Sequence, residues 1–489
     1  MKTKKIVSAV LVFVWALFLG FPQVWAGGRQ EDKTPELVWA FATWGTIPPE
    51  TGKVETAINT YLESRNMGFK VKLMPMGIAD MTQKLNLMLA SPSEPLDVFF
   101  CRSFLSNIDK GQLVPLDEYL TTKGQGMVKA VGEVYLQSGR VNGVQYGIPS
   151  IRDMASGLGF LITKEYVDKY KLDISSVKKL EDITPILATI KKNEPNFYPL
   201  SMNAGFQLLR SINFDPLGDN FGVVMPGNSD RVVNLFETSE YRQRVEFFHS
   251  WYRAGYISPD DAASNETAVS VMKAGKACAQ FTANKPGILT ENELSTGRKL
   301  EFADLGNAIV TTGGIQGIIW AVAHNTKYPD KAVELLNLFF TDPTLINLIN
   351  YGIEGEHYVK KADGTITFPP GVTTMNSGYN LAGMDWQLGN SYLAYPWEGK
   401  PADLSAQMKA FNDRGIVSSA YGFVFDNSKV LTQISALTAV ADQYRQPLEY
   451  GAADPSLLNE FNAKLKAAGL DVVIAEKQRQ YDAWRASKK

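Results

Sequence analysis

The chain has 489 residues, with 49 lysine and arginine residues against 51 aspartate and glutamate residues and a formal net charge of −2. Its 45% hydrophobic and 20% charged residues exclude a chain dominated by disorder, and the balanced charge argues against a nucleic-acid partner. Two cysteines and three histidines exclude a disulfide-stapled scaffold and any metal site that needs several cysteines.

The amino terminus has the pattern of an export signal. Three lysines within the first five residues precede the apolar run 6–21, and Val24 and Ala26 occupy the two positions that signal peptidase reads. We expect a signal peptide over residues 1–26, cleaved near Ala26, and a secreted or periplasmic chain; an uncleaved anchor helix is the alternative. No cysteine follows the run, so we expect no lipid anchor. No later stretch has the ~18 uninterrupted apolar residues of a membrane span.

The next part of the chain alternates between strand and helix patterns. Apolar runs and period-two alternation predict strands, whereas apolar positions spaced by three and four predict helices. The predicted elements are a strand over 37–41, a helix over 53–66, a strand over 69–73, a helix over 81–89 and a strand over 96–100. This order is typical of a mostly parallel sheet covered by helices, which binds ligands at the carboxyl ends of its strands. We therefore expect segments 42–49 and 101–106 to face a ligand.

The remaining chain continues in the same style and ends in helices. Predicted strands span 158–162, 276–281 and 315–323. Predicted helices span 164–169, 178–191, 241–254, 269–273, 329–340, 430–444, a segment after Pro455, and 471–487. The sequence contains no internal repeat and no low-complexity linker, which favours two α/β lobes crossed by the chain several times.

Several short motifs, taken in order, resemble those of the extracellular solute-binding proteins of ABC importers. The looser ones are DVFF (97–100), GQLVPLD (111–117), YGIP (146–149), MKAGKACAQF (272–281), TANKPG (282–287) and PDKA (329–332). Three more specific motifs resemble a carbohydrate-type subgroup, family 1, with an extended C-terminal region: NYGIEGEHY (350–358), GFVFD (422–426) and KLKAAGLDVVIAEKQRQYDAW (464–484). The resemblance covers essentially the whole chain after the signal peptide. Residues 172–196 lack the alternating acids of the calcium loop in some relatives, so we expect no structural calcium.

The resemblance implies an α/β fold of the two-lobe periplasmic-binding-protein type, with mostly parallel sheets flanked by helices and an extra helical C-terminal region. The expected boundaries are 36–149 and 308–352 for the first lobe, and 150–307 and 353–489 for the second. The resemblance also implies a monomer that closes on a small-molecule solute between its lobes and passes it to the membrane subunits of an ABC importer. A membrane sensor is the alternative partner. No cofactor, metal or nucleic acid is expected.

A sugar ligand needs flat aromatic faces and planar polar side chains. Trp44 follows the first predicted strand, and Arg102 and Ser103 follow the third. We expect all three at the ligand, with core packing as the alternative for Trp44. Arg152 and Asp153 come where the chain should first cross between the lobes. There, ligand contact and a hinge salt bridge are equal alternatives.

Further candidates lie on loops that the resemblance places at the ligand. Asn203 and Phe206 belong to one such loop, and Asn284 and Lys285 belong to another. Gln316 begins an apolar run and is also a candidate. Large rings inside periodic elements are predicted as core residues, namely Trp39, Trp251, Trp320 and Trp484.

Two more groups lie further along the chain. Glu354 and His357 are candidates for ligand contact; a conformational role, which we prefer, and a metal site with Glu356 are the alternatives. The segment DWQLGNSYLAYPW (385–397) is the densest aromatic cluster, and it is either an added wall of the cleft or a local core. Its candidate ligand contacts are Trp386, Asn390 and Tyr392.

The sequence as a whole predicts an exported substrate-binding protein for an oligosaccharide, based on chain length, aromatic content and the subgroup resemblance. Acidic or amino-sugar glycans are the next alternative, because Arg102, Arg152 and Lys285 would suit a carboxylate. A short peptide comes third. A glycan-active enzyme is remote, since the chain lacks a nucleophile elbow, a zinc-protease motif and nucleotide-binding loops, so we expect no enzyme activity. Cys101 and Cys278 are expected as two buried or half-buried thiols, and a disulfide between them is the alternative.

Overall fold

The computed structural model describes residues 34–43, 47–91, 93–202, 207–263, 266–306, 308–373, 376–381 and 383–488. The predicted signal peptide over 1–26 lies outside the described residues, and so do Trp44, Asn203 and Phe206. Among the described residues, no single helix has the length and apolar composition of a membrane span. One pair, α14 (Pro329–Thr341) and α15 (Pro343–Tyr351), meets these criteria only when its helices are joined across an 88° bend.

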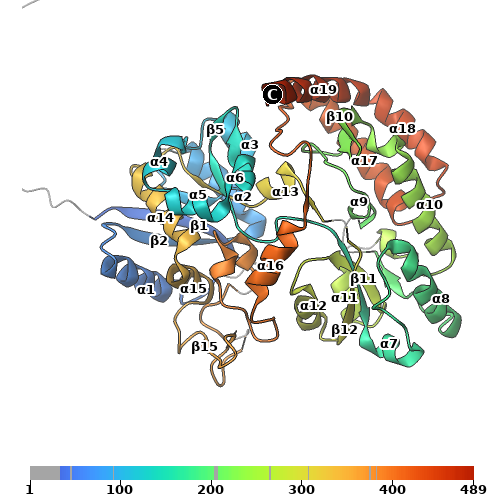
Figure 1. Cartoon of the computed structure of the whole chain (residues 1–489), viewed down its shortest axis with the longest axis horizontal. Helices are drawn as coiled ribbons and strands as arrows, with labels where there is room; N and C mark the ends of the chain where they lie inside the picture. The colour runs from blue at the N-terminus through green and yellow to red at the C-terminus, as the bar shows by residue number, and fades with distance from the viewer. Residues whose placement is uncertain are drawn as a thin grey trace, which may run out of the picture. The chain divides into compact units, whose positions relative to one another are not determined.

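A five-stranded sheet in the order β2-β1-β3-β14-β6 forms the centre of one lobe (Figure 1). Its strands are β1 (Glu36–Thr43), β2 (Lys70–Gly77), β3 (Val98–Phe100), β6 (Gly147–Pro149) and β14 (Ile319–Val322). β1 pairs in parallel with β2 and β3, whereas β14 is antiparallel to β3 and β6. The predicted β-α-β-α-β order at the start is confirmed, with α1 (Thr51–Ser64) and α2 (Ile78–Ala90) as the helices.

Local sequence explains these elements. Every residue of β1 after Glu36 is buried, as expected for a strand that is covered on both faces. Helix α1 buries Val54, Ile58 and Leu62, which are spaced by four and form one stripe. The other elements of this part of the chain are α3 (Phe104–Asp109), α4 (Asp117–Thr122), α5 (Gln125–Val131), α6 (Glu133–Leu136), β4 (Arg140–Val141) and β5 (Val144–Gln145).

A four-stranded sheet in the order β12-β7-β11-β8 forms the centre of the other lobe. Its strands are β7 (Leu158–Thr163), β8 (Leu200–Ser201), β11 (Ala279–Ala283) and β12 (Leu300–Asp304). The surrounding elements are α7 (Lys164–Tyr170), α8 (Thr184–Asn193), α9 (Gln207–Arg210), β9 (Val223–Met225), β10 (Asn228–Val233), α10 (Ser239–Arg253), α11 (Ala268–Lys273) and α12 (Ile288–Thr296). Both sheets mix parallel and antiparallel pairs instead of being mostly parallel. β7 is antiparallel to both β11 and β12, and β14 is antiparallel to both β3 and β6.

The predicted strand over 315–323 is wrong in its first half. Residues Thr312–Gln316 form the short helix α13, and the strand β14 begins only at Ile319. The Thr311 hydroxyl accepts a hydrogen bond from the Gly314 amide at 3.1 Å and so caps the helix. An apolar run alone does not distinguish a buried helix turn from a strand.

Helices dominate the carboxyl-terminal part, as the sequence predicts. They are α16 (Leu404–Asp413), α17 (Leu431–Glu449), α18 (Leu457–Ala467) and α19 (Leu470–Ser487). Gly469 joins α18 to α19 with φ +98°, a left-handed conformation that glycine adopts without steric cost. There are also two short strand pairs, β15 (Val359–Lys360) with β16 (Ile366–Thr367), and β13 (Ile309–Val310) with β17 (Ile416–Val417), which follows α16. In Figure 1, α17 lies beside α10, and α19 lies beside β10.

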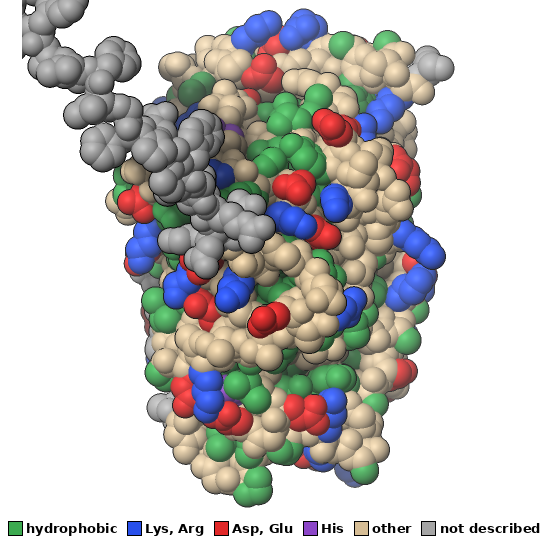
Figure 2. Space-filling model, turned by 90° about the vertical axis from the view of Figure 1, so that its left-hand side faces the viewer, with side chains coloured by type: hydrophobic (Ala, Val, Ile, Leu, Met, Phe, Trp, Pro, Cys, Tyr) green, Lys and Arg blue, Asp and Glu red, His purple; other side chains and the backbone are tan. Residues whose placement is uncertain are grey.

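Two large hydrophobic cores account for most of the buried apolar residues. Trp39 and Trp320 are fully buried in the first core and Trp251 is buried in the second, which confirms them as core residues. Trp484 packs half-buried against the second core. On the face of the molecule in Figure 2, acidic and basic side chains are interspersed among the described residues, in keeping with the net charge of −2.

The distribution of the last third of the chain between the cores differs from the expected one. Tyr379, Leu381, Met384 and Leu388 belong to the first core, whereas residues from Ala420 onward contribute to the second. The buried Tyr379 hydroxyl donates to the Ile349 carbonyl at 2.7 Å, which ties this segment to α15. The lobe boundaries as a whole stay a prediction.

Candidate functional site

Three segments of the chain run side by side between the two cores. Residues 150–157 bridge to β13 through a pair of 2.9 Å hydrogen bonds between the backbones of Ser156 and Ile309. β13 then pairs with β17, which follows α16. A small separate core fills the space around them, made of Met154, Ala155, Val310, Ile315, Phe411 and Tyr421. The interwoven crossing that the sequence predicts is thus built as a hydrogen-bonded unit.

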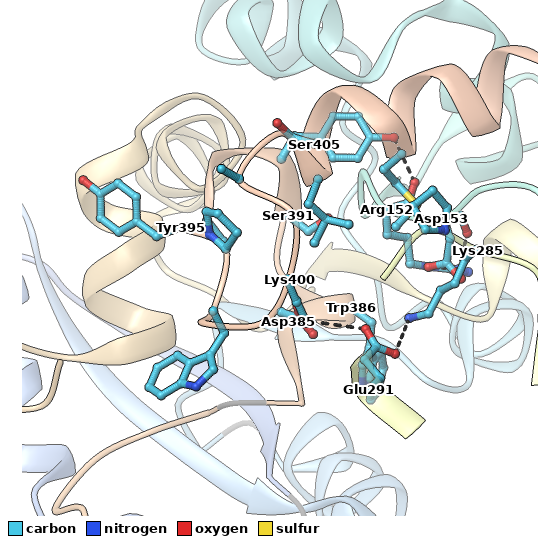
Figure 3. A pocket seen from close by; sticks show the side chains of 18 of the residues that line it. Arg152, Asp153, Lys285, Glu291, Asp385, Trp386, Ser391, Tyr395, Lys400 and Ser405 are labelled. Atoms are coloured by element: carbon cyan, nitrogen blue, oxygen red, sulfur yellow. Dashed lines mark hydrogen bonds and ion pairs between the residues drawn. The ribbon is translucent and has the colours of Figure 1, made fainter. Parts of the chain in front are cut away.

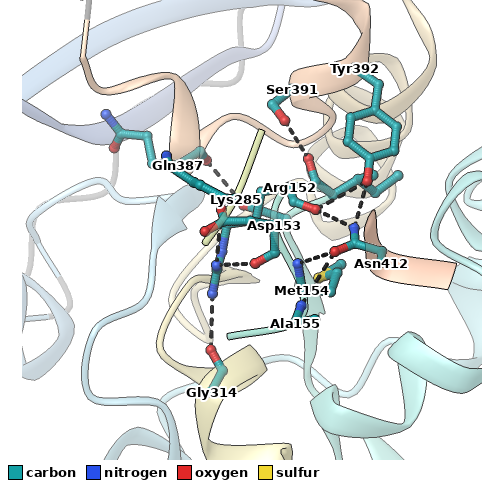
Figure 4. Close-up of polar contacts among 12 residues, drawn as sticks. Arg152, Asp153, Met154, Ala155, Lys285, Gly314, Gln387, Ser391, Tyr392 and Asn412 are labelled. Atoms are coloured by element: carbon teal, nitrogen blue, oxygen red, sulfur yellow. Dashed lines mark hydrogen bonds and ion pairs between the residues drawn. The ribbon is translucent and has the colours of Figure 1, made fainter. Parts of the chain in front are cut away.

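Asn412, at the end of α16, fastens the first of these crossing segments (Figure 4). Its buried side-chain oxygen accepts from the backbone amides of Met154 at 2.8 Å and Ala155 at 3.3 Å. Its side-chain nitrogen donates to the Arg152 carbonyl and to the Tyr392 hydroxyl, both at 2.6 Å. One amide side chain therefore holds four groups, and it sets the position of Arg152 and Asp153.

Arg152 and Asp153 form a salt bridge with each other, the ion pair that one of their two alternatives predicts, and its role at a hinge stays a prediction. The Arg152 Nη1 atom lies 3.3 Å from the Asp153 carboxylate and donates to the Asp153 carbonyl at 2.5 Å. Its Nη2 atom donates to the Gly314 carbonyl at 2.9 Å, which links the first crossing segment to α13 (Figure 4). The same two residues also line the cavities on either side of them, so a role at the ligand stays a prediction.

The first of these cavities, which we call the aromatic pocket, contains most of the rings of segment 385–397 (Figure 3). Its rings are Tyr351, Trp386, Tyr392, Tyr395 and Trp397. Its charged side chains are Arg152, Asp153, Lys285, Glu291, Asp385 and Lys400. Tyr351, Tyr358 and Ile366 form a small core on which Tyr395 and Trp397 pack. The aromatic segment thus has features of both alternatives, a cavity wall and a local core.

The charges of the aromatic pocket are paired with one another. Lys285 Nζ lies 3.2 Å from a Glu291 carboxylate oxygen, and Lys400 Nζ lies 3.3 Å from the other oxygen and 3.5 Å from Asp385. Burial opposes the charged form of Lys285, but the Glu291, Asp153 and Asp385 carboxylates outweigh this effect and raise its pKa. Three cations and three carboxylates leave the pocket without net charge.

The second cavity, which we call the Arg210 cavity, adjoins the other side of Arg152 and Asp153. Its further lining comes from α9 and the segment after it, from the end of β11 and from two crossing segments. The lining residues include Arg210, Asn213, Phe214, Asn220, Ala283 and Thr311. Asn203 and Phe206, which come shortly before α9 in sequence, lie outside the described residues.

Several candidates from the sequence use their side-chain nitrogen in hydrogen bonds within the fold. Asn284 is buried and donates to Asp304 at 2.9 Å, and Gln316 donates to the Ser138 carbonyl at 2.9 Å. Asn390 donates to the Phe340 carbonyl at 3.1 Å. Their contacts are structural, and none of the three is among the described residues that line either cavity.

Arg102 and Ser103 occupy the expected position after β3. Arg102 is exposed, and Ser103 is half-buried immediately before α3. Neither is among the described residues that line the two cavities. Trp44, the expected stacking platform, lies outside the described residues. The roles of these three residues at a ligand stay predictions.

The buried His357 makes two hydrogen bonds that fix the local backbone conformation, in keeping with the preferred conformational role. The Ile353 amide donates to Nδ1 at 2.8 Å, so Nε2 carries the proton and donates to Glu50 at 2.9 Å. This hydrogen bond, ahead of other effects, lowers the pKa of Glu50. Glu354 is exposed and pairs with Lys360 at 2.9 Å.

The acids around His357 are arranged closely enough to suggest a metal site. Ligand atoms of Glu50, Glu356 and His357 lie within 4.8 Å of one another. However, the Lys53 ammonium pairs with both carboxylates, and the histidine nitrogen that faces them carries a proton. Both features oppose a cation, so the group acts as a polar clamp between α1 and the segment after α15.

Four residues of this region escape sequence reasoning: Glu291, Asp385, Lys400 and Asn412. The first three can be recognised as site residues only from the tertiary structure, which brings α12 and segment 385–400 together around the same cavity. Tyr395 and Trp397 carried a signal, since they belong to the aromatic segment. For Asn412, nothing in the surrounding sequence distinguishes it from an ordinary polar residue near a helix end.

Comparison with known proteins agrees with this architecture. Residues 56–352, more than half of the chain, match the family model described as bacterial extracellular solute-binding protein. The chain therefore belongs to the bacterial extracellular solute-binding protein family, as the motif order predicts. Residues 419–486 match a second model, described as a domain of unknown function.

Individual relatives cover almost the whole chain. A carbohydrate ABC transporter substrate-binding protein from Streptococcus pneumoniae serotype 4 is 27% identical over 452 residues, covering 91% of this chain and 90% of the relative. The crystal structure of the N-glycan transport solute binding protein from S. pneumoniae is 26% identical, covers 93% of this chain and 100% of that chain, and has a TM-score of 0.83. The same protein in complex with Man5GlcNAc covers 93% and 99% of the two chains, with a TM-score of 0.70. The two-lobe fold with extra C-terminal helices is thus confirmed.

Proposed function

We propose that this chain is an exported substrate-binding protein that captures an oligosaccharide between its lobes and delivers it to the membrane subunits of an ABC importer. The observation that carries the proposal is the pair of cavities that share Arg152 and Asp153 at the crossing segments. The relatives named above, one for carbohydrate and one for N-glycan transport, support the same ligand class.

The lining of the aromatic pocket suits sugars. Indole and phenol rings offer flat apolar faces to the C–H faces of a sugar ring, and paired charges offer donors and acceptors to its hydroxyl groups. Because two cavities meet at Arg152 and Asp153, a ligand of several sugar units would extend from one into the other. This arrangement favours an oligosaccharide over a single sugar.

The charge balance favours a neutral glycan over an acidic one. Arg152 is already engaged by Asp153 and by the Gly314 carbonyl, and Lys285 is engaged by Glu291. A carboxylate on the ligand would have to displace Asp153 from Arg152 or Glu291 from Lys285. The displaced carboxylate would then lie near the like charge of the ligand. The acids Asp153, Glu291 and Asp385 are likewise paired with cations, which supports binding rather than glycosidic bond cleavage.

Closure of the lobes would couple binding to transport. A ligand that contacts residues from both lobes stabilises the arrangement in which those residues approach one another. The S. pneumoniae N-glycan relative matches this chain with a TM-score of 0.83 in one form and 0.70 with Man5GlcNAc bound. The lower score for the glycan-bound form is in keeping with closure on the ligand.

The test is thermal unfolding and calorimetric titration of the purified chain against neutral, acidic and amino-sugar oligosaccharides and short peptides. A ligand at about 100 times its Kd stabilises the fold by ~2.7 kcal/mol, which shifts the unfolding midpoint upward. Trp386→Ala should weaken binding about fivefold, because one stacked ring contributes ~1 kcal/mol. Tyr119→Ala, in α4, is the control and should bind normally, because this half-buried ring is not among the described residues that line either cavity. A shift with peptides only would overturn the sugar assignment.

A further inference from the structure

The loop between α9 and β9, residues 211–222, has two different environments. Asn213, Phe214, Pro216 and Asn220 line the Arg210 cavity. Other residues of this 211–222 loop turn toward α19, which is more than 250 residues later in sequence. The loop therefore lies between the proposed ligand site and the C-terminal helices.

One lysine of α19 makes the connection. The Lys477 side chain is fully buried, and its ammonium donates to Asp219 Oδ1 at 2.5 Å and to the Gly222 carbonyl at 3.1 Å. The same Asp219 oxygen accepts from the Phe221 amide at 2.7 Å. The ammonium also lies 5.1 Å from the centre of the Phe425 ring. Lys477 thus fixes the second half of the loop through a side chain and a backbone carbonyl.

The first half of the loop adopts a conformation that needs such support. Leu217 has φ +48°, a left-handed conformation that is sterically unfavourable for a residue with a side chain. The Asp215 carboxylate accepts from the Leu217 amide at 2.9 Å, and the Asp215 backbone pairs with Val224. Strained turns of this kind persist only where surrounding contacts over-determine them.

Helix α19 also holds the hairpin that follows the loop. Gln478 accepts from the Val232 amide at 2.7 Å and donates to the Asp230 carbonyl at 3.0 Å. The Tyr481 hydroxyl donates to the Ser229 carbonyl at 2.7 Å. Lys477 is separate from these contacts, because it reaches the loop and not the hairpin tip.

A contribution to fold stability does not by itself explain why Lys477 is buried. Burying an ammonium carries a large desolvation cost, and apolar replacement of buried ion pairs is often neutral or stabilising. Burial lowers the pKa of Lys477, an effect that Asp219 and then Asp215 oppose. The geometry gives the ammonium another use, since its two acceptors fix the backbone next to residues that line the cavity.

We infer that the C-terminal region matched as a domain of unknown function supports the ligand cavity, and that Lys477 is the positioning residue that orders the 211–222 loop. The inference rests on the proposed function, because it concerns the same site. Lys477 itself touches no ligand; it acts through the loop.

The experiment compares the wild-type chain with Lys477→Met and Asp219→Ala, using hydrogen exchange and calorimetric titration with a neutral mannose-containing oligosaccharide. Both variants should speed exchange of the Leu217 and Phe221 amides about tenfold. The thermal midpoint should change little for Lys477→Met, which removes the buried charge, and should fall for Asp219→Ala, which leaves the buried ammonium without its carboxylate. If the loop is then ordered about a tenth of the time, the apparent Kd rises about tenfold. Asp219→Asn keeps an oxygen acceptor and should restore most of the affinity lost in Asp219→Ala. Gln478→Ala, on the neighbouring position of α19, is the control that should leave loop exchange and binding unchanged.

The outcomes separate the inference from the proposed function. Unchanged loop exchange in Lys477→Met overturns the support role, whether or not a glycan binds. Faster loop exchange with an unchanged Kd overturns the link to binding. If wild type binds no glycan, the proposed function fails, and the exchange data alone still decide the support role. If Lys477→Met fails to fold, the partly exposed Asp219 carries the test through Asp219→Ala and Asp219→Asn.

Discussion

Replacing Asn412 with alanine should loosen the crossing between the lobes. The substitution removes the acceptor of the buried Met154 amide, and it removes the donor to the Arg152 carbonyl and the Tyr392 hydroxyl. A buried backbone amide without a partner costs about 1–3 kcal/mol. The Arg152 carbonyl keeps its hydrogen bond from the Tyr392 hydroxyl at 3.1 Å. Losing the second hydrogen bond to this carbonyl, from Asn412, therefore adds less to the destabilisation. We expect the free energy of unfolding to fall by about 2–3 kcal/mol.

Urea unfolding followed by both tryptophan fluorescence and far-UV circular dichroism measures this effect, since coincident curves verify a single transition. Asn193→Ala is the matched control. Its amide makes one exposed hydrogen bond to the Thr189 carbonyl, so its effect should stay within about 0.5 kcal/mol. A loss below about 0.5 kcal/mol for Asn412→Ala would refute the assignment of Asn412 as the fastener of the crossing.

Further predictions concern single groups elsewhere. Hydrogen bonds from Arg479 and Gln480 lower the pKa of Glu476 from 4.5 to about 2, so its stabilising contribution is present above pH 4.5 and is lost as the pH falls toward 2. The midpoint difference between wild type and Glu476→Gln should therefore shrink across that window; a constant difference would contradict the assignment. His357→Ala should cost about 1–3 kcal/mol of stability by leaving the Ile353 amide without its acceptor, with the Kd for glycan unchanged in titration. Burial raises the pKa of the Cys101 thiol to about 12 and also raises that of Cys278. Neither thiol should react with a thiol reagent in the folded chain at pH 8, and both should react after denaturation.

The sequence by itself determined the local elements and the class of fold. Apolar runs and helical spacing predicted β1, α1 and the C-terminal helices, because their burial is set by periodicity within one segment. The same reasoning predicted the buried Trp39, Trp251 and Trp320, and the two buried free thiols. Motif order then indicated the family that the comparison confirms.

The candidate site was predicted only in part. Arg152, Asp153, Lys285, Trp386 and Tyr392 do line the aromatic pocket, since each lies at a crossing or in a segment with a clear aromatic signal. Asn284, Gln316 and Asn390 occupy the same kind of position, yet their side chains bind nearby backbone or side-chain groups. Position along the chain thus indicates which loop is near the site, but not where its side chains point.

Only the tertiary structure decided the partners of the polar groups. His357 meets Glu50 from a position 307 residues away, and Lys477 meets Asp219 across 258 residues. Asn412 meets the crossing segment in the same way. A helix or strand pattern depends on neighbours a few residues apart, whereas a buried polar contact depends on which distant segments the packed cores bring together.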